Sequence, residues 1–244
     1  MEPAMGDRNI HTFRILAVIG LVAFISGCAA PGPTDEKDPF EGFNRSMYDF
    51  NDMLDRNVLK PVAQGYNYVL PNPVNKSISN AFNNIDDVVV IFNDIMQLKP
   101  TQTGSDIGRF LINSTVGIGG LFDVAKEVDL VKHEEDFGQS MGYWGIGNGP
   151  YLVLPLLGPM TVRDGIGSGV DAFADPLNYI EPDAALYSVQ LLEVVDKRAG
   201  LLSATKILKE AALDPYLFVR DAYLQKRRNL VYDGNPPPED FEEL

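Results

Sequence analysis

The sequence is poor in cysteine and in basic residues. Cys28 is the only cysteine among 244 residues, so no disulfide can form within the chain. Lysine and arginine number 20 against 34 aspartates and glutamates, and the resulting net charge of −14 would be repelled by nucleic acid. We therefore exclude nucleic acid as a partner, and the fold must rest on packing rather than on cross-links.

The sequence also offers little for catalysis. One of its two histidines, His133, lies next to the acidic run 134–136, which is typical of a solvated loop. The Gly-Ser-Gly at 167–169 lacks the spacing of a nucleophile elbow. The glycine clusters at 117–120 and 145–149 lack the preceding strand and the lysine of a phosphate-binding loop. We expect no catalytic residue, no metal site and no cofactor.

The apolar run near the N-terminus is too short to cross a membrane. Residues 15–25 would form a helix of about 16 Å at ~1.5 Å per residue, against the ~30 Å of a bilayer core. Small residues and a cysteine follow in the sequence Ile25-Ser26-Gly27-Cys28. This pattern is typical of a bacterial lipoprotein signal. The alternative is an ordinary signal peptide that a cysteine follows by chance.

Under the lipoprotein interpretation, the Cys28 thiol receives a diacylglyceryl group and becomes the mature N-terminus. Two or three acyl chains anchor a protein stably, whereas one chain binds a membrane only marginally. Ala29 follows the cysteine where an aspartate would retain a lipoprotein in the inner membrane. We therefore expect a lipid-anchored protein of the outer membrane of a Gram-negative cell, facing the periplasm.

The rest of the chain divides into three parts. Residues 28–37 contain two prolines and form a short tether, while residues 38–233 form one helical domain. Residues 234–244 are acidic and rich in proline, which predicts a disordered tail or, alternatively, a short interaction tail. Together with a signal peptide at residues 1–27, this accounts for the whole sequence.

Apolar residues recur at helical spacing through most of the domain. Asp38-Pro39 is typical of an N-cap followed by the first helical residue, and we expect Pro61 to end this helix and Pro100 to end the next. The expected helices lie near residues 38–60, 72–99, 105–115, 121–128, 164–174, 183–199, 201–213 and 214–230. The sequence therefore predicts an all-α domain of about seven or eight helices.

The segment 136–159 differs from the rest because it is both apolar and dense in glycine and proline. Such a composition excludes a continuous helix. One interpretation is a buried connection packed beneath helices. The other is a hydrophobic path or a membrane interface, where tyrosine and tryptophan are favoured. The candidates for contact with lipid in this segment are Tyr143, Trp144, Tyr151, Leu152 and Leu154.

Several long motifs resemble the VacJ/MlaA family of outer-membrane lipoproteins. The first is Asp-Pro-Phe-Glu-Gly-Phe-Asn-Arg-Ser-Met-Tyr-Asp-Phe-Asn at residues 38–51. The resemblance extends from the lipoprotein signal to about residue 230. The other motifs that carry it are residues 109–125, residues 136–159 with Arg163-Asp164, residues 214–216 and residues 220–223.

The resemblance implies a ring-like helical body in the inner leaflet of the outer membrane, associated with a trimeric porin. It implies retrograde transport: glycerophospholipids misplaced in the outer leaflet pass through a central amphipathic channel to a periplasmic lipid-carrier protein, which maintains lipid asymmetry. No cofactor is expected. Two alternatives remain, a porin-associated structural adaptor without its own lipid path and a lipid hydrolase that would depend on His133.

Further residues of the family motifs are candidates for the lipid path. Asn44, Asn51 and Asn113 offer neutral polar contacts for a headgroup, with helix capping and core hydrogen bonds as the equal alternative. Arg163 offers a cation for a lipid phosphate, with an ion pair to an acid such as Asp164 as the alternative. A bulky or charged residue in place of Phe50, Leu152 or Leu154 would block such a path.

Overall fold

The computed structural model describes residues 38–238. The expected signal peptide, the lipidation residue Cys28 and the tether lie outside these residues, as does the end of the acidic tail. Asp38, the expected N-cap, does not cap a helix: the position before α2 is Phe40, and no side chain bonds to the first turn. Asp38 is instead buried, where it accepts hydrogen bonds from Asn44 and Tyr216.

One continuous helix opens the domain. α2 (Glu41–Leu54) passes through a π-helical turn, η1 (Asp55–Leu59), into α3 (Lys60–Val69). The prediction that Pro61 ends this helix is wrong. The Lys60 amide bonds to the carbonyl five residues back, so the wider turn places Pro61 in the first turn of α3, where a missing N–H is tolerated.

α4 (Asn72–Met96) and α5 (Pro100–Thr115) form a helical hairpin, which we call the arm. Pro100 begins α5 rather than ending α4, because a proline at the first helical position lacks only an N–H that would have no partner there. The expected helix near 121–128 is only a short 3₁₀ turn, η2 (Ala125–Val128).

The second half of the domain alternates short and long helices. Side chains of Asp136, Thr161, Asp175 and Asp214 cap four of these elements by accepting from backbone amides. The elements are α6 (Phe137–Tyr143), β1 (Tyr151–Leu154), β2 (Gly158–Thr161), α7 (Val162–Ala174), η3 (Pro176–Tyr179), α8 (Asp183–Gly200), α9 (Leu202–Ala211) and α10 (Pro215–Val231).

The apolar segment rich in glycine and proline is more regular than its composition predicts. Its first part is helix α6, because the Asp136 carboxylate caps a helix that ends before Gly145. Its last part contributes to an antiparallel hairpin in which Tyr151 pairs with Thr161 and Leu154 with Gly158. The irregular part is thus confined to residues 144–150 and the hairpin turn.

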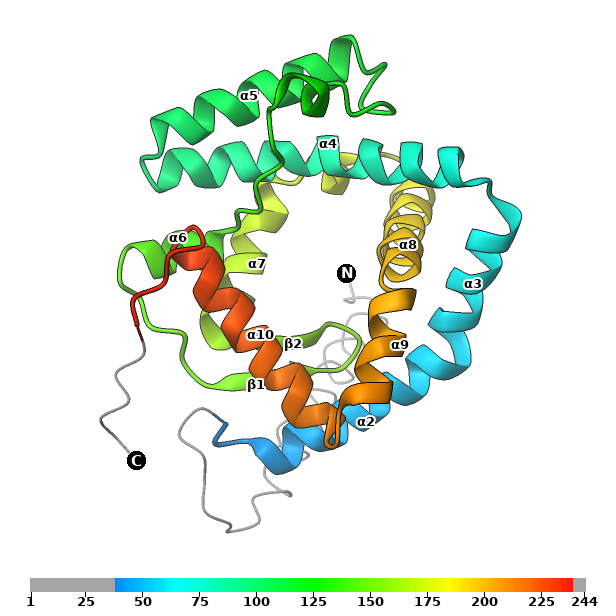
Figure 1. Ribbon diagram of the computed structural model, residues 1–244, viewed down its shortest axis with the longest axis vertical. Coiled ribbons are helices and arrows are strands. Elements are labelled where there is room, and N and C mark those ends of the chain that lie inside the picture. Colours follow the sequence, from blue (N-terminus) through cyan, green and yellow to red (C-terminus); the bar gives the residue numbers. More distant parts are fainter. Residues whose placement is uncertain (1–37, 239–244) are drawn as a thin grey trace, which may run out of the picture.

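The helices follow one another around a ring (Figure 1). α3 packs on α8, α8 on α4, α4 on α6 and α7, α6 on α10, and the hairpin joins α10 and α7 to α2. Counting α2 to α3 as one rod, residues 38–238 form eight α-helical segments, two short 3₁₀ turns and a single two-stranded sheet. The prediction of a single all-α, ring-like domain is confirmed.

The domain buries many polar side chains and exposes many large apolar ones. The fully buried group includes Asn44, Asp87, Asp94 and Asp106, whereas Leu111, Phe122 and Phe173 are exposed. Such a surface is unusual for a protein surrounded only by water. None of the helices in the described range is long and apolar enough to cross a membrane.

Candidate functional site

The β-hairpin lies inside the outline of the ring (Figure 1). Its turn, Pro155-Leu156-Leu157, projects across the interior toward α9 in this view. Leu156 is 74% exposed and Leu157 is 71% exposed. Leu156 also has a φ of 68°, a conformation that is costly for a bulky residue. The hairpin turn, which lies within the outline of the ring, therefore carries two exposed leucines.

Two asparagines of α2 hold the outer edge of β1. Asn44 donates to the Tyr151 carbonyl at 3.0 Å and accepts from the Val153 amide at 2.9 Å. Asn51 donates to the Leu154 carbonyl at 2.9 Å and accepts from the Leu156 amide at 2.8 Å. The seven-residue step from Asn44 to Asn51 spans ~10 Å of helix, and the three-residue step between their bonding positions on the strand spans about the same distance. Helix and strand therefore stay in register.

The two faces of β1 have different surroundings. Tyr151 and Val153 are buried and pack with Tyr216 into a small core between α2 and α10. Leu152 and Leu154, on the other face, are half-buried. Phe50 lies on α2 beside Asn51 and is exposed. The structure thus brings five of the predicted residues together at the hairpin: the two asparagines, Tyr151, Leu152 and Leu154.

An ion network lies beneath the hairpin, where α6, α7 and α10 meet. Arg227 of α10 donates to Asp136 at 2.9 Å and to Asp164 at 2.7 Å. Tyr223 donates its hydroxyl proton to Asp164 at 2.5 Å. Burial raises the pKa of Asp136, but the hydrogen bond and charge of Arg227 outweigh burial and leave that pKa below its usual value. Sequence analysis did not mention Arg227, and it included Tyr223 only as part of the family motif at residues 220–223.

Arg163 belongs to the same network. Its side chain is buried, donates to the Ile146 carbonyl at 3.1 Å and lies 3.5 Å from a carboxylate oxygen of Asp164. Asn113 is also buried, away from the hairpin, where it donates to Asp123 and accepts from the Ala125 amide. Arg163 thus forms the ion pair, and Asn113 the core hydrogen bonds, that the sequence offered as alternatives to contact with lipid.

The glycine-rich connection between α6 and β1 carries an exposed aromatic pair. The rings of Tyr143 and Trp144 meet edge to face with centroids 5.5 Å apart. The Trp144 indole donates to the Met96 carbonyl at the end of α4, and the Lys99 ammonium lies 5.8 Å from the Tyr143 ring. Gly145 takes a φ of 84°, which favours glycine there. This connection therefore links the hairpin to the arm.

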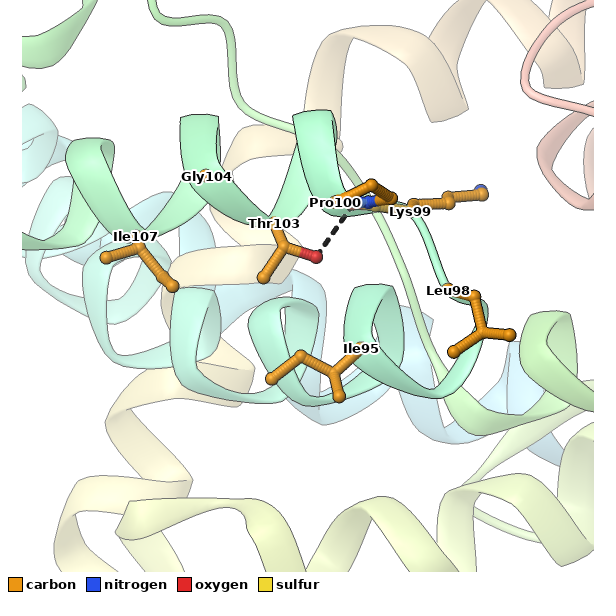
Figure 2. Close-up of a pocket in the computed structure, with 7 residues that line it drawn as sticks. All are labelled: Ile95, Leu98, Lys99, Pro100, Thr103, Gly104 and Ile107. Atoms are coloured by element: carbon orange, nitrogen blue, oxygen red, sulfur yellow. Dashed lines mark hydrogen bonds between the residues drawn. The ribbon is translucent and has the colours of Figure 1, made fainter.

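Figure 2 shows a groove on the arm, between the end of α4 and the start of α5. It has a volume of about 540 Å³ and a mostly apolar lining. The Thr103 hydroxyl donates a hydrogen bond to the Lys99 carbonyl, so it is not a free donor in the groove. The residues that line the groove are Ile95, Leu98, Lys99, Pro100, Thr103, Gly104 and Ile107. Sequence reasoning placed Pro100 at the end of a helix and did not predict this groove.

The site has no recognisable catalytic or metal-binding geometry in the part of the chain that the structure describes. His133 bonds through Nδ1 to the buried Asp106. No group of three or more histidine, aspartate or glutamate side chains is arranged to hold a metal ion within residues 38–238. What the arrangement offers is an apolar hairpin turn within the outline of the ring, held in place by the side-chain bonds of Asn44 and Asn51.

Comparisons with known proteins agree with this geometry. A family model described as MlaA lipoprotein matches residues 36–230. The intermembrane phospholipid transport system lipoprotein MlaA of Escherichia coli (strain K12) is 34% identical over 234 residues, which are 93% of this chain and 92% of the relative. The protein of the same name from Haemophilus influenzae is 34% identical over 237 residues, which are 92% of this chain and 93% of the relative.

A solved structure has a similar fold. It comes from work on the structural basis for maintenance of bacterial outer membrane lipid asymmetry and superposes with a TM-score of 0.71 at 34% sequence identity. The match covers 81% of this chain and 99% of that chain. An uncharacterized protein of Rickettsia bellii is 35% identical over 208 residues, which are 85% of this chain and 80% of that protein.

Proposed function

Because the chain belongs to the MlaA lipoprotein family, we propose that it removes mislocalised glycerophospholipids from the outer leaflet of the outer membrane and passes them to a periplasmic lipid carrier. The observation that carries the proposal is the ring of helices with an apolar hairpin turn inside it. The match extends over most of the chain and most of the relatives, which supports transferring the role of the whole protein.

The exposed apolar side chains support a position within one leaflet. They occur on the arm, on α7 and on α8, where water would hydrate them unfavourably and lipid tails would not. Tyr143, Trp144 and Lys99 form the kind of group that favours a membrane–water interface. Lipidation at Cys28 would hold the body at the outer membrane, and a trimeric porin is the proposed partner there.

Within the ring, acyl chains would contact the hairpin and its neighbours. Leu152, Leu154, Leu156 and Phe50 supply apolar surface that is wholly or partly exposed. The buried amide of Asn44 is fully engaged with the protein, so its role in transport would be to position the hairpin. Asn113 and Arg163 are engaged in the same way, and direct contact of either with a headgroup stays a prediction.

The function can be tested in a Gram-negative strain that lacks its own family member. Surface phosphatidylethanolamine is labelled with an amine reagent that does not cross the membrane. The wild-type chain should restore low labelling, whereas Leu152→Glu and Leu154→Glu should not, because a buried charge in an apolar path is costly. Leu213→Glu, at a fully exposed leucine between α9 and α10, is the matched control and should restore it.

The same experiment separates the alternatives. A structural adaptor without its own lipid path would tolerate Leu152→Glu, provided that the variant still co-purifies with the porin after cross-linking. A lipid hydrolase would lose its activity in His133→Ala, whereas a transporter would keep low surface labelling. Native mass spectrometry of the purified protein should show bound phospholipid. Its absence, together with full complementation by Leu152→Glu, would refute transport through the ring.

A further inference from the structure

The carboxyl group of Asp38 connects two helices that flank the hairpin. Asp38 is only 1% exposed, and an aspartate is almost never buried so completely unless it is paired. Its Oδ1 atom accepts a hydrogen bond from the Asn44 amide of α2 at 2.7 Å. Its Oδ2 atom accepts from the Tyr216 hydroxyl of α10, and a guanidinium nitrogen of Arg220 lies 3.6 Å away. The two carboxylate oxygens therefore have partners on different helices.

The bond to Asp38 completes the set of hydrogen bonds that the Asn44 amide makes. The NH2 group of Asn44 donates to Asp38 and to the Tyr151 carbonyl, while its oxygen accepts from the Val153 amide. An amide NH2 group has two hydrogens to donate. Without Asp38 one of them would have no acceptor, which is unfavourable because Asn44 is fully buried. Asp38 therefore supports the residue that holds β1.

Asn51 provides a comparison within the same helix. It makes the same two kinds of bond to the hairpin, one to the Leu154 carbonyl and one from the Leu156 amide. Within residues 38–238 no carboxylate bonds to the Asn51 amide, and the bond at Leu156 is exposed. The base of the hairpin, at Asn44, is thus buried and supported by a carboxylate, whereas its turn is held by two bonds alone.

Tyr216 connects this support to α10. Burial raises the pKa of the Tyr216 hydroxyl and the bond to Asp38 raises it further, so the hydroxyl remains a donor at every physiological pH. The Arg45 guanidinium lies 4.5 Å from the centre of the Tyr216 ring, and the Tyr151 ring meets it edge to face. A continuous chain of hydrogen bonds therefore extends from α10 through Asp38 and Asn44 to β1.

We propose that Asp38 and Tyr216 are positioning residues for lipid passage, which act through Asn44 to fix the base of the hairpin. Asp38 directly follows residues 28–37, the expected tether, so the anchored end of the chain joins the body at this support. This role rests on the proposed lipid path at the hairpin, because a base that shifts would move Leu152 within that path. The fixing of β1 itself can be measured without transport.

Hydrogen–deuterium exchange of the full mature chain in detergent micelles measures how firmly β1 is held. Tyr216→Phe removes only the hydroxyl that bonds to Asp38. Tyr66→Phe is the matched control, because the Tyr66 hydroxyl bonds to a different buried acid, Asp196. The peptide that covers β1 should exchange about threefold faster in Tyr216→Phe and at the wild-type rate in Tyr66→Phe. Exchange of α5 should be the same in both variants.

Substitutions of Asp38 itself test the acceptor. Asp38→Ala removes both bonds, and the loss of a hydrogen bond to a charged group should speed exchange of β1 about tenfold. Asp38→Asn retains an oxygen that can accept from Asn44, so its rate should remain within about threefold of the wild type. The proposal is overturned if Tyr216→Phe and Tyr66→Phe give the same rate for β1, a comparison that decides even if Asp38→Ala does not fold. It is also overturned if Asp38→Asn exchanges as fast as Asp38→Ala.

The labelling of surface phosphatidylethanolamine tests the role in lipid passage. Asp38→Ala and Tyr216→Phe should both raise labelling above the level of the wild-type chain, whereas Tyr66→Phe should leave it low. Low labelling in a variant whose β1 exchanges faster would overturn the role in passage, while transport by the chain would stand. If the wild-type chain itself does not restore low labelling, the proposed function fails and the role in passage fails with it. The exchange rates would then still show whether Asp38 and Tyr216 position β1.

Discussion

The two halves of this molecule neutralise their acidic side chains in different ways. Beneath the hairpin, Asp136 and Asp164 share the guanidinium of Arg227. In the arm, no donor within residues 38–238 bonds to the buried carboxyl of Asp94. Burial raises the pKa of Asp94 to about 8, so this acid carries a proton at neutral pH. A guanidinium stays charged at every pH that proteins meet, whereas a proton leaves as the pH rises. The hairpin region should therefore hold its shape in alkali, and the arm should loosen.

Arg227→Met is the strongest test of the hairpin half. It leaves the buried carboxylate of Asp164 and the half-buried carboxylate of Asp136 without their shared cation. Removal of one partner of a buried ion pair, as Arg227 and Asp164 form, costs about 4 kcal/mol. The pKa of Asp136 is lowered in the folded state, so the stability from this contact is present above the unfolded value of ~3.9 and is lost as the pH falls through the folded value. The difference between wild type and variant should therefore be largest near neutral pH and shrink in acid.

Urea unfolding in micelles at neutral and acidic pH measures this difference. Arg227→Lys is the control, because a lysine keeps the charge but cannot bond to both acids through a planar fork. Arg227→Lys should lose less stability than Arg227→Met. Its difference in unfolding free energy from the wild type should also become smaller in acid. Equal losses at every pH would mean that packing, rather than charge, explains the role of Arg227.

Asn44→Ala tests the uncharged hydrogen bonds that hold the hairpin to α2. The change leaves the Tyr151 carbonyl, the Val153 amide and Asp38 without the amide partner, and buried polar groups left unpaired would cost about 3 kcal/mol together. Asn57→Ala is the control, because the Asn57 amide bonds only within its own helix and is exposed. Unfolding in urea should show a loss below about 0.5 kcal/mol for the control. A similar loss in both variants would contradict a positioning role for Asn44.

The helices could be predicted from the sequence because their signals are local. Apolar spacing identified α4, α8 and α10, and Asp214 caps α10 as its pattern with Pro215 predicts. The errors have local causes as well. In an α-helical turn a proline lacks the N–H that bonds four residues back, and its ring crowds that carbonyl. The π-helical turn before Pro61 relieves this constraint.

The roles of side chains at the site could not be predicted in the same way. Asn44 and Asn51 contact residues more than 100 positions away in the sequence, so no local pattern shows that they hold a strand. Arg227 likewise pairs with Asp136 and Asp164, which lie 91 and 63 positions away in the sequence. The groove of the arm arises from the packing of two helices, which a periodic pattern leaves undetermined. The ring itself was expected from family resemblance, and nothing in the apolar spacing indicated it.

Two exposed leucines with the same backbone conformation allow a direct comparison of the hairpin with the arm. Leu156 in the hairpin turn has a φ of 68°, and Leu98 in the turn of the arm has a φ of 57°. Asparagine tolerates this conformation better than leucine, so Leu156→Asn and Leu98→Asn should each leave stability unchanged or raise it by about 0.5 kcal/mol. Only Leu156→Asn should raise the labelling of surface phosphatidylethanolamine, because only Leu156 lies within the proposed path. Equal effects of the two variants on labelling would contradict the proposal that the hairpin turn, but not the turn of the arm, lies in the lipid path.

The smallest effects are expected in the glycine-rich connection that links the halves. A Cβ at Gly147 would meet no atom within 4 Å, and its φ is not positive, so Gly147→Ala should stabilise the protein by about 0.5 kcal/mol through the unfolded state. Gly145 has the same free space but a φ of 84°, so Gly145→Ala should destabilise it by about 1 kcal/mol. Thermal unfolding of both variants measures the difference. If movement of this connection admits lipid, Gly147→Ala should also raise the labelling of surface phosphatidylethanolamine, because a stiffer connection opens less often. Labelling should then rise although the variant is more stable than the wild type. Unchanged labelling would show that the hairpin and the arm act without a hinge between them.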